Sequence, residues 1–493
     1  MSSPAERIIG PILFLDQIGE GLLQLAALFI APPETTPPPV DAGAGPVAPV
    51  CLARYASACV WRARFALPAD RPSGYAWNGT RFELASDLRG DLRIAYVSCN
   101  GEENGDLDRE GAERNAMWAR LGEAHRRDPF ALLLHGGDQV YADEVTDGHP
   151  LSQDWPGRVP ADPDPAALAS LGAYLRERFL GRYAAIYRAP ETAWLLARVP
   201  SLMQWDDHDI CDGWGSLPRD RTGSAVGQTL YAAAREAFLL FQQATVAGDL
   251  PGRFADPAGG HLGWTLAAPG LRLVAPDLRG ERGRRNILGP GGRALMEAEA
   301  ARPPPGHTLL LSSVPLLGPR MSLLEAAMWI VPRMQKYEDD LRDQWQSRAH
   351  RDEWRQMLRL VERMAATGGV TALSGEIHLA TRAEMGLEGG GVLHQLVASG
   401  IAHRPPPRAW ARMLGALSFL GGDPLPGRPI RIRPLPGQPH RYTAERNFLT
   451  LDRRGTDWSA RWTLEQSGPT PALSLAAQQL SRGAPARQAR RRG

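Results

Sequence analysis

The sequence is organised around residues 205–216, which read Trp-Asp-Asp-His-Asp-Ile-Cys-Asp-Gly-Trp-Gly-Ser. Four carboxylates, a histidine and a thiol lie between Asp206 and Asp212, directly after an apolar segment at residues 201–205 that predicts a buried strand. Crowded carboxylates repel one another unless a cation lies among them, and open α/β sheets keep their chemistry where strands end. A solvated acidic turn is the alternative, but surface turns rarely carry two tryptophans. The stretch therefore predicts one wall of a metal site.

Length and composition describe a soluble globular protein. The chain has 493 residues, of which 43% are hydrophobic and 22% are charged, so we expect two domains or one large domain with additions. A net charge of +2 gives no electrostatic reason to expect a nucleic acid or a membrane as partner. The arginines of residues 487–492 predict a solvated end rather than a binding arm.

The cysteine content does not indicate a disulfide scaffold or a zinc knuckle. No pair has the Cys-x-x-Cys spacing, so free, buried thiols are expected, although the first two of the four could pair: Cys51, Cys59, Cys99 and Cys211. The first residues offer only Arg7 as a basic group, with no twin arginine, and polar residues at 16, 17 and 20 interrupt the apolar stretch 8–31. These features predict no signal peptide, no membrane span and a cytoplasmic location.

The first 90 residues predict a small β-rich domain. Residues 8–14 and 22–30 are two apolar runs joined by a glycine-containing turn, which favours two strands, with a helix through residues 22–28 as the alternative. Residues 32–49 form a Pro-rich loop, and residues 75–82 predict a strand, a turn and a strand.

From residue 91 to residue 467 the pattern alternates between strands and helices, which predicts an α/β sandwich domain. Strands are expected at residues 92–97, 130–134, 201–205, 271–275, 308–312 and 370–372, and helices at 109–125, 165–180, 182–197, 227–244 and 351–366. Residues 445–451 and 458–464 predict a closing hairpin, and residues 468–493 a disordered basic tail.

Four polar clusters each begin where an expected strand stops. They are Ser98-Cys99-Asn100, residues 135–143, residues 206–212 and Ser374-Gly375-Glu376-Ile377-His378. Parallel neighbouring strands would bring these ends to one edge of a sheet. The carboxylates, imidazoles, phenol and thiol in the clusters suit iron or zinc beside a harder cation better than they suit a cage of oxygen ligands.

Three of these clusters resemble a known family. Gly137-Asp138-x-x-Tyr141-Ala142-Asp143, the 205–216 run and Ser374-Gly375-x-x-His378 are similar to motifs of the PhoD-like alkaline phosphatases, within the calcineurin-like metallophosphoesterase superfamily. The resemblance runs from about residue 92 to residue 400. It implies a four-layer αββα catalytic domain preceded by a small β-sandwich domain, and it favours strands over a helix in residues 8–30.

The resemblance also implies metal ligands. Asp138 would bridge two metals, and Cys99 and Tyr141 would bind ferric iron as thiolate and phenolate, because an acidic Fe3+ keeps both deprotonated. Asp207 would bind the second metal, where the wider superfamily uses asparagine. His378 would be a further ligand. The expected pair is Fe3+ and Ca2+, with another divalent cation such as Zn2+ or Mn2+ as the alternative.

Three further residues are candidates for the site. His208 is placed to hydrogen-bond the phosphate or to protonate the leaving oxygen. Arg279 could pair with a non-bridging phosphate oxygen or lie on the surface. The resemblance also implies Glu376 as a metal ligand, but it stands where the family usually has aspartate, so its extra methylene brings the occupancy of the second metal into question.

The remaining polar residues of the clusters have structural interpretations as well. Cys211 is expected to pack, and His135 is expected to be a structural histidine at the end of a strand. Asp143, Asp209 and Asp212 are expected to be ligands or to orient the loop.

The sequence thus predicts a metal-dependent phosphoester hydrolase, a phosphatase or phosphodiesterase that activates water at a dinuclear or multinuclear site. The expected partner is a phosphorylated small molecule or a phosphodiester. A non-catalytic or weakly active relative that binds metal or phosphate is the alternative. A metallohydrolase of another bond, such as a peptide, is disfavoured because no His-Glu-x-x-His is present.

Overall fold

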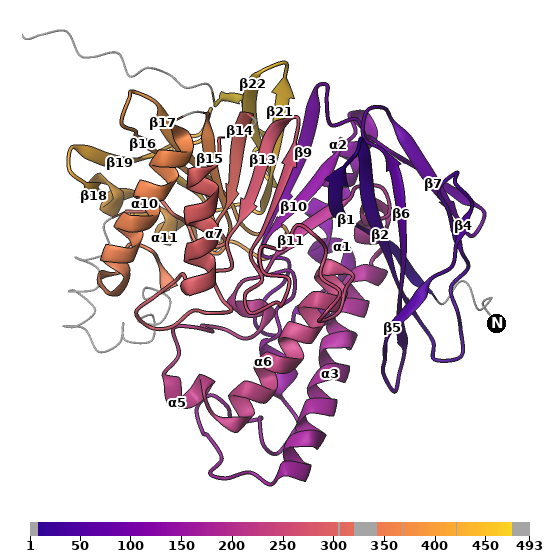
Figure 1. The fold of residues 1–493 in the computed structure, drawn as a ribbon. Coiled ribbons are helices and arrows are strands. Elements are labelled where there is room, and N and C mark those ends of the chain that lie inside the picture. The colour runs from indigo at the N-terminus through magenta and orange to yellow at the C-terminus, as the bar shows by residue number, and fades with distance from the viewer. Residues whose placement is uncertain (1–7, 304–305, 320–342, 367, 421, 476–493) are drawn as a thin grey trace, which may run out of the picture.

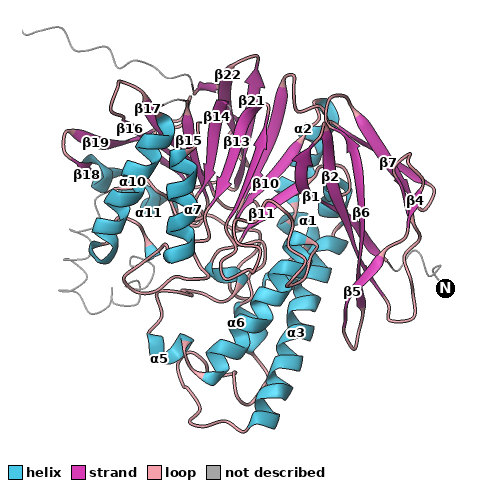
Figure 2. Cartoon of the chain, in the orientation of Figure 1, coloured by secondary structure: helices cyan, strands magenta, loops and turns pink. Residues whose placement is uncertain are grey.

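The protein is built from two large β-sheets that stack face to face between two layers of helices (Figure 1, Figure 2). This computed structural model describes residues 8–303, 306–319, 343–366, 368–420 and 422–475. The α/β class expected from the alternation of strands and helices is confirmed.

The first sheet has 11 strands and holds most of the candidate site. In spatial order it contains β23 (Gly468–Pro469), β22 (Asp457–Leu464), β21 (Asn447–Arg454), β9 (Leu92–Val97), β10 (Leu132–Gly136), β11 (Ser201–Gln204), β1 (Ile9–Gly19), β2 (Leu22–Ala31), β6 (Cys59–Pro68) and β5 (Val50–Arg54), with β24 (Leu473–Ser474) beside β22. Strands β9, β10, β11 and β1 are parallel neighbours, and their carboxyl ends therefore point to the same edge.

The second sheet has nine strands. In spatial order it contains β12 (Trp264–Ala268), β13 (Gly270–Ala275), β14 (Gly306–Leu311), β15 (Val370–Ser374), β17 (Val392–Ala398), β16 (Ala380–Gly386), β19 (Arg428–Arg433) and β18 (Gly422–Leu425), with β20 (Tyr442–Thr443) beside β16. Its central strands are buried on both faces. Leu309 and Leu311 of β14 join the core between the sheets, whereas Leu310 packs under the helices. This is why the strand reads as a continuous apolar run.

Helices cover the outer faces of both sheets (Figure 1). Over the first sheet lie α1 (Gly111–Arg114), α2 (Ala116–Arg127), α3 (Pro165–Arg188), α4 (Pro190–Leu196) and α6 (Ala225–Ala237), with α5 (Arg219–Thr222) below them. Over the second lie α7 (Pro290–Ala301) and α10 (Arg351–Ala365), and α11 (Arg408–Leu417) packs beside β20. No helix in the described residues is long and apolar enough to cross a membrane. The cytoplasmic location stays a prediction.

Two helices expected at residues 165–180 and 182–197 are divided at a different place. α3 continues through Gly181 as far as Arg188, and the break comes before Pro190, at the start of α4. A glycine inside a helix costs only about 1 kcal/mol, whereas a proline cannot donate the backbone hydrogen bond that would continue the helix.

The N-terminal strands extend the first sheet across the boundary predicted at residue 90. β1 lies parallel to β11, with Phe14 opposite Ser201, and β2 pairs with both β1 and β6. The alternative helix at residues 22–28 is therefore wrong, because β2 is bonded along both edges. Hydrophobic pattern alone does not say which strand pairs with which, so the sequence could not show this continuity.

A third sheet completes a sandwich at the N-terminal end. It contains β4 (Pro46–Val47), β3 (Val40–Asp41), β7 (Ser73–Trp77) and β8 (Thr80–Leu84), so part of the expected Pro-rich loop is paired. Its rings pack on strands of the first sheet: Trp77 lies 5.0 Å from Phe29, and Tyr75 lies 5.2 Å from Phe65, between ring centroids. One layer of this β-sandwich-like region is thus the end of the first sheet.

The C-terminal tail also begins later than predicted. β23 and β24 hydrogen-bond to β22, so the expectation of disorder from residue 468 is wrong for residues 468–475. Thr470 lies between them, and its backbone N–H donates to the Trp462 carbonyl. The basic residues 487–492 lie outside the described residues.

Candidate metal centre

The four polar clusters meet at one edge of the two-sheet core. Three of them follow β9, β10 and β11, which are parallel neighbours in the first sheet. The fourth follows β15, which belongs to the second sheet, so the expectation of a single sheet edge is corrected. The sheets touch here: the Ser98 hydroxyl donates to the Ala398 carbonyl at 2.9 Å, and the Ile401 N–H donates to the Ser98 carbonyl at 3.0 Å.

Four of the proposed ligands or their neighbours have unusual backbone conformations. Cys99, Asp138, Glu376 and His378 have φ values of 56°, 55°, 68° and 52°. Positive φ is uncommon in residues other than glycine and costs of order 1–3 kcal/mol where packing holds it. Each of these residues lies in the first turn after its strand, and the turn directs its side chain across the edge of the sheets.

A thiol, a phenol, a carboxylate and an imidazole converge between the sheets. The Cys99 thiol donates to Asp138 Oδ2 at 3.4 Å, and Cys99, Asp138 and His378 each offer a ligand atom within 4.8 Å of the others. The Tyr141 hydroxyl shares a hydrogen bond with His378 Nε2 at 2.9 Å. Ser399 stabilises the group, because its hydroxyl accepts from the His378 N–H at 2.8 Å and lies 3.1 Å from the Cys99 sulfur.

Three buried carboxylates form the other half of the centre. Asp138, Asp206 and Asp207 have ligand oxygens within 4.8 Å of one another. In the described structure, Asp138 Oδ1 and Asp206 Oδ2 are buried and have no hydrogen-bond donor. Burial and the neighbouring Asp206 raise the pKa of Asp138 well above its ordinary value, and burial raises the pKa of Asp206 to about 6 against the lowering effect of Arg279. Buried acceptors without donors are rare and costly, and a cation is the group that would satisfy them.

Burial also keeps the thiol and the phenol protonated in the metal-free chain. It raises the pKa of Cys99 well above its ordinary value, with Asp138 adding to the effect, and it raises the pKa of Tyr141 in the same way. Only a strong local positive charge makes the thiolate and the phenolate more stable than the protonated thiol and phenol. The donor set therefore fits a metal cation.

Arg279 lies behind the carboxylates and is fully buried. Its Nε donates to Asp206, its Nη1 donates to the Trp214 carbonyl at 3.1 Å, and both Nη atoms donate to Asp343 at 2.8 and 2.5 Å. Its Nη2 also lies 3.2 Å from Asp207 Oδ1. The guanidinium thus directs its donors to carboxylates and to one backbone carbonyl, and Arg279 is not among the residues that line the cavity described below.

Asp209 holds the loops together. Its carboxylate accepts from the backbone N–H groups of Asp138, Val140 and Asp206 at 2.9, 3.1 and 2.9 Å. It also accepts from Gln242 at 2.8 Å, which lies on a π-helical turn after α6. Between the two roles left open for Asp209, the contacts favour orientation of the loop.

His208 is oriented by Asp143. Its Nδ1 lies 2.9 Å from Asp143 Oδ2, and the other Asp143 oxygen accepts from the Asp212 N–H at 2.7 Å. Burial by itself lowers the pKa of His208, but Asp143 and Asp207 outweigh it and raise the pKa well above its ordinary value. The ring stacks on Tyr141 with centroids 4.3 Å apart. The Asp143 contact and the stacked Tyr141 ring therefore hold the His208 imidazole in one orientation beside the proposed metal ligands.

The structure separates Glu376 from the ligand clusters. Its two oxygens accept from Gln344 Nε2 at 2.6 and 2.8 Å, and it does not belong to any potential metal-binding group of the described residues. The contacts of two other residues agree with the structural roles expected for them. Cys211 belongs to the hydrophobic core, and His135 bonds Gln139 at 2.7 Å and Ser201 at 3.2 Å.

Sequence analysis missed three polar residues of this centre. Glu103 and His403 approach His378, and the His378 and His403 rings stack with centroids 3.4 Å apart. His403 follows β17. A search for polar residues after this fifth strand could therefore have identified His403 from the sequence. Asp343, which holds Arg279, belongs to no recognisable motif.

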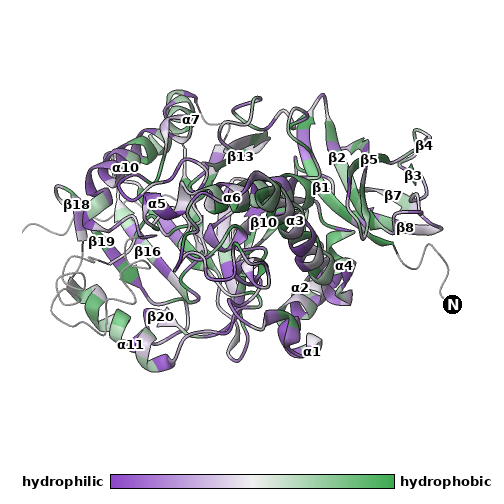
Figure 3. Cartoon of the chain, turned by 90° about the horizontal axis from the view of Figure 1, so that it is seen from below, coloured by the Kyte–Doolittle hydropathy of each residue, from purple (hydrophilic) through white to green (hydrophobic). Residues whose placement is uncertain are grey.

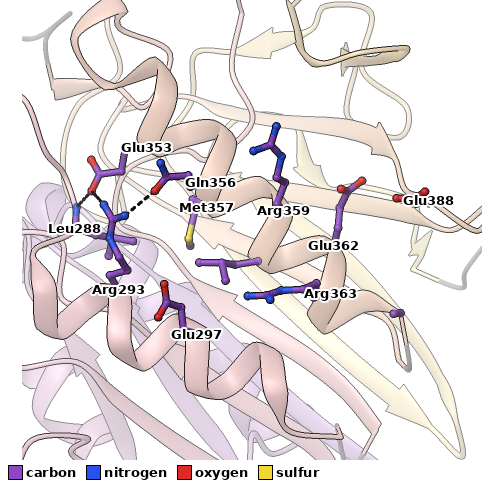
Figure 4. A pocket seen from close by; sticks show the side chains of 12 residues that line it. Leu288, Arg293, Glu297, Glu353, Gln356, Met357, Arg359, Glu362, Arg363 and Glu388 are labelled. Atoms are coloured by element: carbon purple, nitrogen blue, oxygen red, sulfur yellow. Dashed lines mark hydrogen bonds and ion pairs between the residues drawn. The ribbon is translucent and has the colours of Figure 1, made fainter.

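A cavity of about 390 Å³ opens over the centre. Among its lining residues are Asp207, His208, Asp212, Glu376 and His378. A larger groove of about 650 Å³ lies between α7 and α10 (Figure 4). There Arg293 donates to Gln356 at 2.6 Å, and Glu353 accepts from the Ile287 and Leu288 N–H groups at 2.6 and 3.1 Å. These two charged groups of the groove hold structure, and none of the proposed metal ligands lines it, so the smaller cavity is the candidate site.

Comparison with known proteins agrees with this geometry. A family model described as PhoD related phosphatase matches residues 100–337. The predicted family resemblance is confirmed. This PhoD-related region contains Asp138, Tyr141, Asp207, His208 and Arg279, whereas Cys99, Glu376 and His378 lie outside it.

Solved structures share the fold at low sequence identity. The structure of PhoD has a TM-score of 0.55 and 10% identity, and the match covers 97% of this chain and 92% of PhoD. The purple acid phosphatase PPD1 from yellow lupin (Lupinus luteus) has a TM-score of 0.53 and 9% identity. That match covers 95% of this chain and 74% of PPD1. These matches confirm the expected fold class.

One curated relative is similar in sequence. Uncharacterized protein YGR266W of Saccharomyces cerevisiae is 24% identical over 438 residues, which cover 69% of this chain. The match spans 61% of the yeast protein, so the chain accounts for less than two thirds of that relative's length.

Proposed function

We propose that this chain is a metal-dependent phosphoester hydrolase. The observation that carries the proposal is the pair of buried carboxylate oxygens without donors, on Asp138 and Asp206, beside a thiol, a phenol and an imidazole. These groups lie where a cavity opens, and the family match supports phosphoester chemistry at the site.

The residues divide into two proposed metal positions. Asp138 lies between Cys99, Tyr141 and His378 on one side and Asp207 on the other, so it would be shared. The soft thiolate and phenolate suit Fe3+, and the carboxylate side suits a hard cation such as Ca2+, with Zn2+ or Mn2+ as the alternative. When bound, such metals polarise a phosphoryl oxygen and lower the pKa of a coordinated water.

The chain itself would supply orientation and a proton. Because His208 Nδ1 is hydrogen-bonded to the Asp143 carboxylate, the Nε2–H is the group that can bind the substrate. It would hydrogen-bond the phosphate or protonate the leaving oxygen as the ester bond breaks. The stacked Tyr141 ring and the Asp143 carboxylate limit rotation of the imidazole, which keeps that proton in one place.

Two roles inferred from the sequence are revised in this proposal. Arg279 would act by positioning: it holds Asp206 and Asp207 against their mutual repulsion rather than touching a phosphate oxygen. Glu376 would hold Gln344 at the cavity wall, and the second metal would rely on Asp207. We retain both a phosphomonoester and a phosphodiester as substrates of the proposed reaction.

Substitution of Asp138 by asparagine tests the function. Asp138→Asn removes one negative charge from the shared position, so we expect bound metal to fall and kcat/KM for aryl phosphate monoesters and diesters to drop by at least about 10²-fold. Metal analysis, steady-state kinetics and circular dichroism would be measured together. Asp108→Asn, the same change at an exposed position, is the control.

The outcomes separate the two candidate functions. Undiminished hydrolysis by Asp138→Asn would remove the dimetal proposal. A wild-type protein that holds metal and turns over neither ester class would instead be the non-catalytic binding relative.

A further inference from the structure

The cavity over the metal centre has both polar and apolar walls. Side chains of the candidate centre supply a polar wall, where a phosphate group would lie, and Gln344, Gln346, Thr381 and Tyr442 also line the cavity. The apolar lining residues are Leu317, Val397, Trp410, Leu414 and Ile432. Apolar walls offer no hydrogen bonds to a polar group, so the part of a substrate that lies against them is apolar.

Helix α11 joins the cavity wall to the protein surface. Trp410 and Leu414 line the cavity, and Met413 and Leu417 share their face of the helix, at the spacing i, i+3, i+4, i+7. α11 lies at the periphery of the molecule and carries hydrophobic segments there (Figure 3).

Exposed apolar side chains gather on this element. The described residues expose five large hydrophobic side chains, and three of them are in α11 or in the turn that follows it: Val50, Leu107, Trp410, Met413 and Phe419. Phe419 is 76% exposed and Met413 is 40% exposed. Single exposed hydrophobic residues are ordinary, but a cluster at the mouth of a cavity marks a contact surface.

Basic side chains accompany the apolar ones. Arg408 and Arg412 are exposed on α11, the guanidinium of Arg441 lies 3.5 Å from the centre of the Phe419 ring, and residues 408–419 contain no carboxylate. A helix with aromatic and aliphatic residues on one face and arginines beside them matches the chemistry of an anionic lipid surface.

We propose that the substrate is a phosphoester that carries a long apolar chain and is taken from an anionic lipid surface on which α11 rests. The phosphate would lie at the metal centre and the chain along the apolar wall. Water adds its oxygen to phosphorus, the ester P–O bond breaks, and the leaving oxygen takes a proton, so the products are a phosphate and an alcohol. This inference rests on the proposed hydrolase function.

Binding to vesicles tests the surface without using activity. The full chain is floated with vesicles of phosphatidylcholine and phosphatidylserine, and with vesicles of phosphatidylcholine alone. We expect binding to the anionic vesicles, weakened about tenfold or more in the double variant Met413→Ser/Phe419→Ser. The matched control is Val50→Ser/Leu107→Ser, which removes two other exposed apolar side chains away from the cavity and should bind as the wild type does.

Hydrolysis of a chain-length series tests the cavity. Phosphoesters with the same headgroup and with short or long chains are compared, below and above the concentration at which they aggregate. For the wild type, kcat/KM should rise about tenfold or more from the short to the long chain, with a further rise on aggregation. Leu414→Gln places an amide in the apolar wall, so it should reduce the ratio of long-chain to short-chain kcat/KM.

The outcomes separate this inference from the function on which it rests. Turnover that is independent of chain length, or absence of binding to anionic vesicles, overturns the inference and leaves the phosphoester hydrolase standing. Absence of turnover of every phosphoester by the metal-loaded chain overturns the proposed function, and the inference with it.

Discussion

Three features of its surroundings affect the pKa of Tyr141. It is buried, it is close to Cys99 and Asp138, and its hydroxyl is bonded to His378 Nε2 at 2.9 Å. Burial raises the pKa of the phenol well above its ordinary value, and the two neighbouring acids add to this. In the chain alone the phenol is therefore neutral, and a bound cation is the agent that would make it a phenolate.

A phenolate on ferric iron absorbs visible light, which gives the first prediction at this scale. The iron-loaded protein should be coloured, and Tyr141→Phe should lose the visible band while keeping iron, because Cys99, Asp138 and His378 remain. The absorption spectrum and the iron content are measured on the same samples. Tyr183→Phe, at another buried tyrosine, whose hydroxyl accepts from Gln242 Nε2 at 2.8 Å, should keep the band. A colourless wild type with full iron occupancy and activity would contradict the assignment.

Single residues show how far sequence could predict the site. Cys99, Asp138 and His378 each follow an apolar strand, and strand ends in a layered sheet converge, so their grouping was predictable. The partners of Arg279 were not. Asp343 reaches the guanidinium from a distant segment without a motif, and side-chain contacts between such segments leave no local pattern in the sequence.

Elements were predicted where local chemistry decides them. The strands expected at residues 92–97 and 370–372 and the helix expected at residues 351–366 follow from their hydrophobic periods, and the structure has them at Leu92–Val97, Val370–Ser374 and Arg351–Ala365. Partners of the elements were harder to predict. β15 placed its polar end beside the first sheet although it belongs to the second, because packing of one sheet on the other is not encoded in either strand alone.

Helix α2 carries a buried histidine that couples its packing to pH. His125 lies in the last turn, and its Nδ1 accepts from the Phe130 N–H at 3.1 Å. Burial lowers its pKa to about 4, with Arg198, Arg93 and Arg126 adding to the effect. The histidine thus stays neutral in the folded state at pH values where the unfolded chain, with a pKa near 6.5, is protonated.

This histidine should make the protein less stable in mild acid. Because the pKa is depressed in the folded state, the stabilisation is complete above about pH 6.5 and is lost as the pH falls towards 4. Between pH 7 and pH 5 the contribution of His125 to the free energy of unfolding should fall by roughly 2 kcal/mol. His125→Asn keeps an acceptor for Phe130 and removes the titration, so its stability should depend less on pH.

Urea unfolding of both proteins at several pH values provides the measurement. The variant is expected to be less stable at pH 7, because it loses the packing of the ring against Trp194 and Phe130. The informative quantity is the slope with pH. Equal slopes for wild type and variant would show that His125 is not the group that titrates. His440→Asn, at an exposed histidine, is the matched control.

At the scale of the whole molecule, the N-terminal strands and the rest of the chain share one sheet and several ion pairs. Arg253 donates to Asp16 at 3.4 Å, and Arg64 joins Asp16 and Asp249 at 2.9 and 2.8 Å. Arg453 of β21 donates to the carbonyls of Leu88 and Gly90 at 2.9 and 2.6 Å. These contacts cross the boundary that composition alone places at residue 90.

The last prediction therefore concerns the effect of cutting the chain at residue 90. Removal of residues 1–90 would strip β1 from β11 and expose a strand edge, together with the side chains that pack on Phe14 and Leu28. An exposed apolar edge of this kind favours aggregation. We expect residues 91–493 expressed alone to be insoluble or aggregated, and co-expression of residues 1–90 as a separate chain to recover soluble protein, because β1 can pair with β11 without a covalent link. Soluble yield, size-exclusion profile and metal content are compared with those of the full chain. A monomeric 91–493 fragment that binds metal and melts at the same temperature as the full chain would show that the core closes without these strands, and would restore the boundary predicted from the sequence.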